Sequence, residues 1–443
     1  MENEDDNRMT LIQIEDHLGQ EKLMYLDILT KKDLIFCFSM SILIFVLAII
    51  GGILSPQREH EFETSSVFKD NQTKSIFKIS NISKWNYFVK AYLSLDLDDS
   101  SSNDLIDARF TVSAKSFKNE IQTADEIPSK RIFRQLKLDS QELVTDFAEI
   151  FSGLCTDFDT LLIAVKLENK IESCTGITIK WQYGHPHAPL LQFFVRCLLA
   201  HQSIRCLIKY LDFLSRSSYR TWHLEQKLTF MLLILCVFAA HPLYILEFFD
   251  PSQLGIIFTI FTETLLFSYI KFFIIVLFDS LVHRNCPKGC CFFFKRLFVM
   301  ITDFIIVFAY NIICSDLLSL DLIPFHITPK VSQILHIGKI IISVFAAILI
   351  IISILRATYA CDTSERYKFN AYLTTVLIGL GFYILMLLCS RNKKIGRTNF
   401  GFILYYAILI FLVNIFSYLH SPYDKTMKTT VRMFSSEQLA DQL

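Results

Sequence analysis

Three ionisable side chains lie within long apolar stretches of the sequence, where charge is rare. His241, Glu263 and Asp303 each fall inside a separate run of mainly apolar residues. At about 1.5 Å of helix rise per residue, we expect His241 and Glu263 about 12 and 13 Å below the same membrane face, and Asp303 roughly two turns deeper. A charge in hydrocarbon is costly unless it meets a partner or a polar cavity. We therefore expect the three to line one ligand cavity, with an interhelical polar clamp that binds no ligand as the alternative.

A second group of reactive side chains is a cysteine cluster in a basic segment. Cys286, Cys290 and Cys291 lie in the stretch HRNCPKGCCFFFKR between two apolar runs. A structural zinc site needs about four ligands, and only His283 is close enough in sequence to join the three cysteines. Cysteines beside basic residues at a membrane boundary are typical of reversible palmitoylation. We expect palmitoylation here, with ordinary reduced thiols as the alternative.

The remaining motifs give no support for an enzyme. The sequence contains no GxxxxGK[ST], GxSxG or HExxH pattern. A P-loop enzyme, a serine hydrolase of the GxSxG type and a helix-borne zinc hydrolase therefore have no support. His185 and His187 flank Pro186, but no further metal ligand lies near them in sequence, so we interpret this segment as a surface loop. We expect no catalytic residue, no metal and no cofactor. A formal net charge of +0 also argues against nucleic acid as a partner.

The elements that carry these residues are membrane helices. Of the 443 residues, 52% are hydrophobic and only 19% are charged, which is typical of a membrane protein. The uncharged run 34–54 predicts a signal-anchor helix, which we place at 33–55. A bundle of seven helices, comparable to that of a G-protein-coupled receptor, is expected over 188–420. Its spans are the runs 190–213, 228–249, 254–282, 297–318, 334–355, 372–389 and 400–419, the first of which is interrupted by Arg196.

The distribution of Lys and Arg predicts the orientation. With eight spans, most basic residues of the loops, including those of 205–227 and 284–296, fall on the side of the N-terminus. Basic loops stay in the cytosol, so we expect cytosolic tails at 1–32 and 421–443. The basic segment 391–397 falls on the opposite side and does not fit this rule.

The segment 56–187 between the first two spans is then luminal or extracellular. Apolar residues alternate with polar ones over 85–95, 110–114 and 177–183, and 161–167 is largely apolar, which predicts a β-sandwich. Two glycosylation sequons begin at Asn71 and Asn81. Cys155 and Cys174 are the only cysteines in the segment, and an oxidising compartment favours a disulfide between them. Two buried free thiols are the alternative.

Several short motifs carry a resemblance to a known family. They are WHLEQK at 222–227, His241-Pro242, Arg356-Ala357 and Ser421-Pro422. Together with the order of domains, they resemble the transmembrane protein 181 family, which is related to Wntless and to other seven-helix proteins with a Golgi-dynamics (GOLD) domain. The resemblance covers roughly 33–422. Relatives tend to carry Asn or Asp where this chain has His241, and the basic loop 391–397 is a second departure.

The resemblance implies a luminal, GOLD-like β-domain that recognises a ligand, set on a receptor-like helical core. Family members carry or sort secretory cargo, which is lipid-modified in the case of Wntless, or are described as receptors. We therefore expect a cargo or sorting receptor of the Golgi and other endomembranes that contacts membrane lipid and a luminal protein or lipidated cargo. Trafficking adaptors are expected to bind its cytosolic loops.

Two other functions remain open from the sequence. One is a receptor at the cell surface that recruits a G protein through the basic segment 205–227. The other is a channel or proton-linked carrier that uses His241, Glu263 and Asp303.

Overall fold

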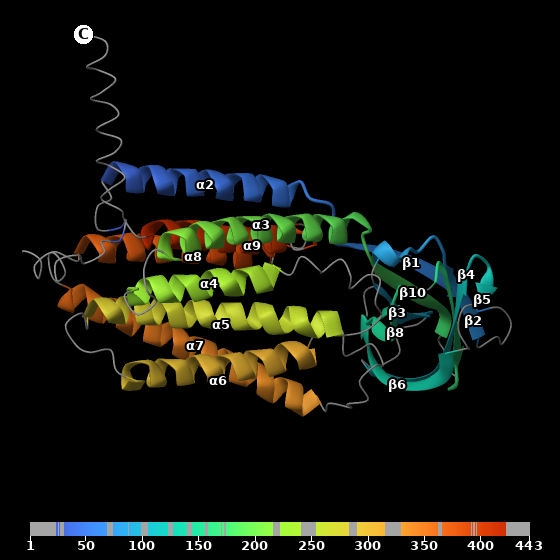
Figure 1. Cartoon of the computed structure of the whole chain (residues 1–443). Helices are drawn as coiled ribbons and strands as arrows, with labels where there is room; N and C mark the ends of the chain where they lie inside the picture. The colour runs from blue at the N-terminus through green and yellow to red at the C-terminus, as the bar shows by residue number, and fades with distance from the viewer. Residues whose placement is uncertain are drawn as a thin grey trace, which may run out of the picture.

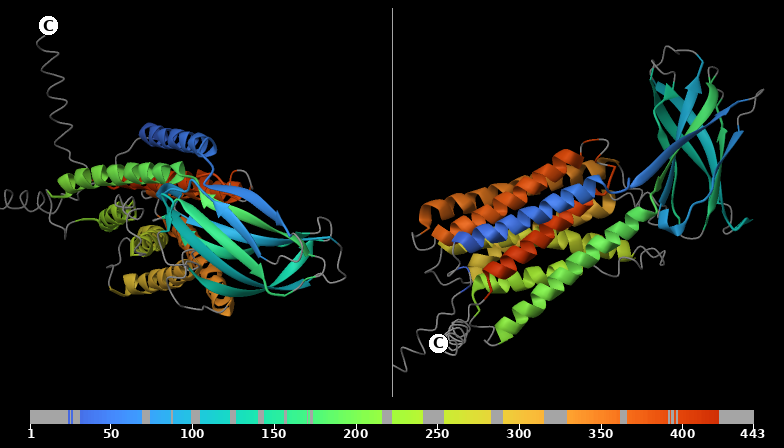
Figure 2. Two further views of the ribbon diagram at one scale, coloured as in Figure 1. Left: turned by 90° about the vertical axis from the view of Figure 1, so that its right-hand side faces the viewer. Right: turned by 90° about the horizontal axis from the view of Figure 1, so that it is seen from above.

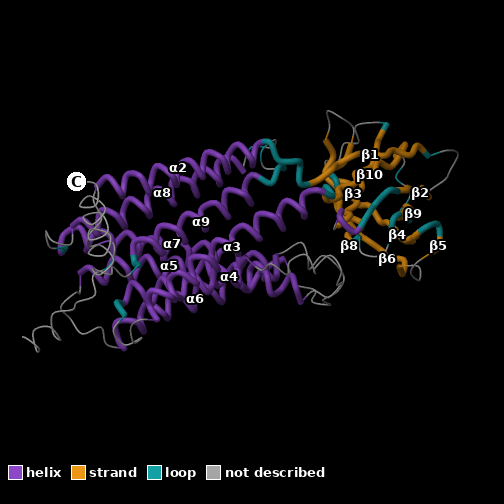
Figure 3. The backbone as a smooth tube through the Cα atoms, turned by 45° about the horizontal axis from the view of Figure 1, so that its top comes forward, coloured by secondary structure: helices purple, strands orange, loops and turns teal. Residues whose placement is uncertain are grey.

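The chain folds into a strand-rich domain at one end of a bundle of long helices (Figure 1). The structure is a computed structural model. It describes residues 24, 26, 31–68, 74–86, 88–98, 105–122, 127–139, 144–155, 158–169, 171, 174–215, 222–240, 254–282, 290–314, 329–361, 366–390, 392, 395 and 397–421. Figure 3 shows all the strands gathered at one end and the helices running away from them. This separation matches a division into one membrane-embedded part and one part outside it.

The helices lie side by side along a common direction. Their bounds are α2 (Lys31–Ile53), α3 (His187–Ser215), α4 (Leu224–Ala240), α5 (Leu254–Val282), α6 (Cys290–Cys314), α7 (Pro329–Ala360), α8 (Arg366–Ser390) and α9 (Phe400–Leu419). Within the described residues, five of them, α2, α5, α7, α8 and α9, are long and apolar enough to cross a membrane. Helices α3, α4 and α6 run alongside these five (Figures 1 and 2).

The outer faces of the bundle carry large exposed apolar side chains, unlike the surface of a water-soluble protein. Helix α9 is enclosed, and its Phe411, Val413 and Phe416 are at most 1% exposed. Large apolar side chains instead cover the outside of α2 and α7, where Phe36 is 68% and Ile341 is 63% exposed. An apolar outer surface of this extent is stable in hydrocarbon and not in water. The helical part is therefore an integral membrane domain.

Helix α2 packs against the last helix of the bundle, as Figure 2 shows from above. Its Phe45 ring stacks on Phe382 of α8, with ring centroids 3.6 Å apart, and contacts Phe411 of α9 at 5.3 Å. Near its end, Gly52 lies so close to α9 that an added Cβ would be 3.0 Å from the Phe400 Cα. Glycine at this position therefore permits the close approach of the first and last membrane helices.

The strand domain is a single antiparallel sheet that curves into a barrel-like shape. Its strands are β1 (Glu59–Val67), β2 (Lys74–Ile79), β3 (Phe88–Leu97), β4 (Leu105–Lys118), β5 (Ile121–Gln122), β6 (Ile127–Asp139), β7 (Val144–Thr145), β8 (Ala148–Leu154), β9 (Thr160–Leu167) and β10 (Cys174–Gly184). The order is β1-β10-β3-β7-β6-β4-β9-β2, with β8 on β3 and β5 on β4. A single 3-10 turn, Lys84–Asn86, precedes β3.

The strand domain has the two layers of the predicted sandwich, but the prediction did not include the strand that connects them. One layer contains β1, β10, β3 and β8, and the other contains β2, β9, β4 and β6. The short strand β7 pairs with both β3 and β6, so the layers join along one edge and the domain is barrel-like. The side chains of the predicted strands form its core: Val89, Ala91, Leu93 and Leu95 of β3, Phe110 of β4, and Ile177, Ile179 and Trp181 of β10 are fully buried.

Candidate intramembrane ligand site

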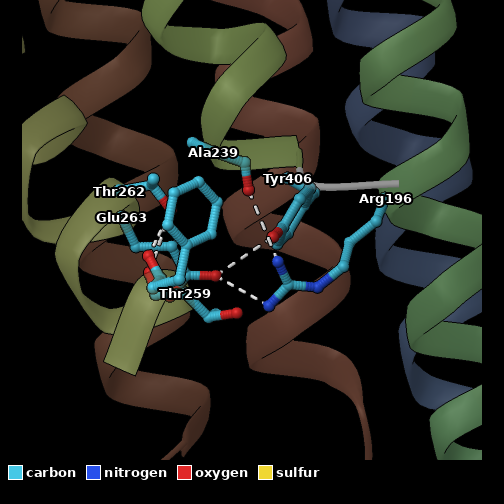
Figure 4. Close-up of polar contacts among 7 residues, drawn as sticks. Arg196, Ala239, Thr259, Thr262, Glu263 and Tyr406 are labelled. Carbon is cyan, nitrogen blue, oxygen red and sulfur yellow. Dashed lines mark hydrogen bonds and ion pairs between the residues drawn. The ribbon is translucent and has the colours of Figure 1, made fainter. Parts of the chain in front are cut away.

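Four helices of the bundle meet around a buried arginine. Arg196 of α3 forms an ion pair with Glu263 of α5, at 2.8 Å between Nη2 and Oε1. Tyr406 of α9 donates a hydrogen bond to the same carboxylate oxygen at 3.1 Å, and Arg196 Nη1 donates to the Ala239 carbonyl of α4 at 3.4 Å. Figure 4 shows the guanidinium group reaching from α3 to these partners. We call Arg196, Ala239, Glu263 and Tyr406 the arginine cluster.

The arginine cluster lies in the half of the helical bundle nearer the strand domain. Arg196 is nine residues after His187, where α3 leaves the strand domain, which corresponds to about 14 Å along the helix axis. The guanidinium group lies 5.6 Å from the Phe402 ring centroid and 5.4 Å from the Tyr406 ring centroid. These aromatic faces stabilise a cation that is out of contact with water.

The two charges of the cluster differ in their access to the surroundings. The Arg196 side chain is only 5% exposed, whereas the Glu263 side chain is 33% exposed. Among the described residues, both hydrogen bonds to Glu263 are accepted by Oε1. The second carboxylate oxygen, Oε2, accepts no hydrogen bond from the described residues. The arrangement can accept a hydrogen bond from a hydroxyl or amide group of a ligand without a net change of charge.

A second ion pair joins α5 to α6. Lys271 Nζ lies 2.7 and 2.9 Å from the two carboxylate oxygens of Asp303, and Ser268 donates a hydrogen bond to Oδ2 at 2.6 Å. The Asp303 side chain is 2% exposed. Lys271 follows Glu263 by eight residues on α5, which places this pair about 12 Å further from the strand domain.

The structure does not bring Glu263 and Asp303 into one site. Their difference in depth is the one expected from the sequence, but each carboxylate has its own cation on a neighbouring helix. For these two residues, the structure shows two separate interhelical ion pairs. His241 lies outside the described residues, so its place in a cavity stays a prediction. From the sequence, Arg196 was noted only as an interruption of its span, and neither Arg196 nor Lys271 was assigned as a partner of these carboxylates.

A third polar network, which the sequence did not suggest, surrounds His420 at the end of α9. His420 is fully buried; its Nδ1 lies 2.6 Å from Thr229 Oγ1 of α4, and its Nε2 lies 2.9 Å from Tyr372 Oη of α8. Its carbonyl accepts hydrogen bonds from Tyr210 of α3 and Gln226 of α4. One residue therefore connects four helices at the end of the bundle away from the strand domain.

The predicted disulfide between Cys155 and Cys174 is not formed. Both residues are free thiols in the structure. Leu154 pairs with Phe88 at one end of β3, whereas Cys174 pairs with Leu97 at the other end. Nine strand residues separate these positions by about 30 Å, and a disulfide requires Cα atoms within about 7 Å. Of the two thiols, Cys155 is buried and Cys174 is partly buried, and burial raises the pKa of Cys174 to about 11.

The modification sites predicted from the sequence are only partly within the described residues. Asn81 is exposed in a turn, with a φ of 63°, and Asn71 lies outside the described residues. Cys286 also lies outside them. Cys290 and Cys291 are the first residues of α6, at the end of the bundle away from the strand domain. Glycosylation and palmitoylation therefore stay predictions.

The basic segment 391–397 has a structural explanation. It connects α8 to α9 at the end of the bundle that faces the strand domain, and its Arg397 forms an ion pair with Glu61 of β1 at 3.2 Å. The Arg58 N–H donates to the Arg397 carbonyl, and Thr398 forms a β-bridge with Gln57. At least one positive charge of this segment is thus compensated by the strand domain.

Comparison with known proteins identifies the helical domain. Residues 189–424 match the family model described as Wntless-like, transmembrane domain. No curated protein sequence matches the chain. The matched range begins within α3 and extends past the end of α9, so it contains the arginine cluster, the Lys271–Asp303 pair and the His420 network. Because the match covers more than half of the residues, the chain belongs to the family of proteins with a Wntless-like transmembrane domain.

Proposed function

We propose that the protein is a non-enzymatic, multi-pass receptor that sorts or carries cargo in the secretory pathway. The Wntless-like transmembrane domain supports a role in secretory trafficking. We assign the strand domain as a GOLD-like luminal domain that binds a partner. This assignment rests on the family of the helical domain and on the resemblance of the chain to the transmembrane protein 181 family. Both termini are cytosolic in this proposal, and residence is in the Golgi and other endomembranes.

The observation that carries the proposal is the position of the arginine cluster beneath the strand domain. The cluster lies about 14 Å along α3 from the point where that helix leaves the strand domain. Its guanidinium group is enclosed, but its carboxylate is one-third exposed. A cargo protein held by the strand domain can therefore extend a lipid or a short polar group toward Glu263.

The test is secretion in cells that lack the protein. Their secreted proteins are compared with those of cells in which the native chain, an E263Q variant or a D279N variant has been restored at equal abundance. Asp279 is the matched control, because it also lies on α5 and forms an ion pair, with Arg296, far from Glu263. We expect a defined set of proteins to be retained without the chain, and secreted again with the native and D279N chains but not with E263Q.

Two results would contradict the proposal. Normal secretion of every protein in the absence of the chain removes the trafficking role. Recruitment of a G protein by the native chain at the cell surface, with secretion unchanged, supports the signalling receptor instead. Equal rescue by E263Q and D279N would leave the trafficking role in place and remove Glu263 from the cargo site.

A further inference from the structure

Three histidines meet where the strand domain joins the bundle. The His185 ring lies 4.6 Å from the His60 ring and 5.3 Å from the His187 ring, measured between centroids. His60 comes from β1 and is brought to the others by the pairing of β1 with β10, in which His60 lies opposite Tyr183. His60 and His185 are half-buried, and His187 is exposed. We call His60, His185 and His187 the histidine triad.

His185 caps the first turn of α3 with its side chain. The His187 N–H donates a hydrogen bond to His185 Nδ1 at 3.1 Å, and the Ala188 N–H donates to the His185 carbonyl at 3.0 Å. Nδ1 accepts a hydrogen bond only when it carries no proton, so the neutral ring must hold its hydrogen on Nε2. Protonation of His185 converts this acceptor into a donor and removes the cap.

The backbone of His185 belongs to the joint that holds the strand domain on the bundle. The His185 N–H donates to the Arg58 carbonyl at 2.9 Å, and the Arg58 N–H donates to the Arg397 carbonyl at 2.5 Å. Arg58 thus connects the start of α3 to the loop between α8 and α9. A displacement of His185 acts on both attachments at once.

The carboxylates near this joint lie on the other face of β1. Side chains alternate along a strand, so Glu59 and Glu61 point away from the face that carries His60. Glu61 is bound to Lys180 of β10 at 2.9 Å and to Arg397 at 3.2 Å, and Glu59 accepts a hydrogen bond from Gln182. On the face of the triad, the neighbours from the adjoining elements are Tyr183, the backbone of Arg58 and the positive end of the α3 dipole. These surroundings favour the neutral form of the His185 imidazole.

The electrostatics of His185 agree with this geometry. Burial lowers the pKa of His185, and the neighbouring His60 and His187 lower it further. The closed joint therefore binds a proton more weakly than an opened joint with a solvated imidazole. The contribution of neutral His185 to the stability of the closed joint is complete above about pH 6.5, the ordinary pKa of histidine. It decreases as the pH falls below that value.

We propose that the histidine triad is a pH-sensitive switch that holds the strand domain on the helical bundle at neutral pH and releases this joint in an acidic compartment. Protonation removes the α3 cap and places like charges on stacked rings, so the start of α3 and the Arg58 bridge separate. The switch requires no bound metal. Among the described residues, no group of three His, Cys, Asp or Glu side chains is placed to hold one. The inference does not depend on the cargo function proposed above.

The test is hydrogen–deuterium exchange of the full chain in lipid nanodiscs at about pH 7.5 and about pH 5.5, with 1 mM EDTA present and absent. The amides at 57–60 and 187–190 report on the joint. After correction for the intrinsic pH dependence of exchange, we expect them to exchange about tenfold faster at the lower pH in the native chain. The H185N variant keeps a side-chain acceptor that does not titrate, so its exchange should not change with pH.

Two further variants separate the proposed switch from a general effect of acid. His201 is an exposed histidine on the same helix, and H201N should behave as the native chain does. A double variant, H60Q with H187Q, removes both neighbouring imidazoles, and the midpoint of opening should move to higher pH. An unchanged joint at low pH, an H185N chain that still opens, or opening that appears only when EDTA is added would each overturn the proposal.

Discussion

Arg196 is almost completely enclosed by helices, and its charge is stable there because Glu263 accepts its hydrogen bond. The desolvation cost of the pair is divided unequally, since the guanidinium group is 5% exposed and the carboxylate is 33% exposed. A carboxylate left without its partner can be neutralised by a proton. An arginine left without its partner keeps its charge.

This asymmetry predicts different costs for the two single substitutions. We expect E263M to lower the free energy of unfolding by about 3 kcal/mol, because it leaves a buried unpaired cation. R196M should cost about half as much, and the R196M/E263M double variant should recover most of the loss. Unfolding in mixed detergent, followed by tryptophan fluorescence, measures all three. Equal costs for the single variants, or additive costs in the double variant, would contradict this account.

Which residues carry charge into the bundle was predictable, but their pairing was not. Glu263 and Asp303 stand out as carboxylates within apolar runs. Their partners depend on how each helix is rotated about its axis and on which helices are neighbours, and neither is encoded in hydropathy. The same reason explains the error at Cys155 and Cys174. The prediction rested on the only two cysteines of a segment placed in an oxidising compartment, whereas strand pairing puts them at opposite ends of β3.

At the level of elements, the close contact of α2 with α9 depends on one glycine of an adjacent pair. An added Cβ at Gly52 would meet the Phe400 Cδ2 at 2.9 Å and its Cα at 3.0 Å, whereas a Cβ at Gly51 would meet nothing within 4 Å. The two glycines lie on the same helix at nearly the same depth. They differ in that Gly52 faces α9 and Gly51 faces away from it.

We expect G52L to separate α2 from α9 and to lower the free energy of unfolding by about 2 kcal/mol through overpacking. G51L adds an apolar side chain on an open face and should change stability by less than about 0.5 kcal/mol. Thermal unfolding of the two purified variants gives the comparison. If both leucines are tolerated equally, α2 is not held against α9 in the way described.

The elements that the sequence predicted best are those with one strong pattern. The continuous apolar runs became helices, and the alternating runs became β3, β4 and β10, with one fully buried face each. Strand β1 was missed because none of its residues is buried, so it has no apolar alternation to recognise. The same strand contributes His60 and Glu61 to the joint with the bundle. The joint was therefore invisible to reasoning from hydropathy.

At the scale of the whole molecule, the segment 391–397 was the exception to the orientation predicted from basic residues. The structure places its described residues next to the strand domain, where Arg397 is bound to Glu61. A basic residue that has a carboxylate partner on the far side of the membrane no longer opposes that location. The predicted orientation and the observed contact are therefore compatible.

This arrangement predicts which sites are accessible in sealed secretory vesicles. A protease site inserted after Asn392 should be protected together with the strand domain, and sites within 1–32 or 421–443 should be cut. The exposed Asn81 should carry a glycan, so N81Q should lower the apparent mass of the chain by one glycan. Cleavage after Asn392 in intact vesicles, with protected tails, would reverse the orientation.

The contact between α2 and α9, together with the β-bridge from Gln57 to Thr398, also has a consequence for biosynthesis. Both join a segment of the chain to one that is translated much later. Helix α2 and the strand domain therefore lack these final neighbours until ribosomal synthesis has passed residue 400. A nascent chain that stops early presents an unpaired α2 and an unattached strand domain.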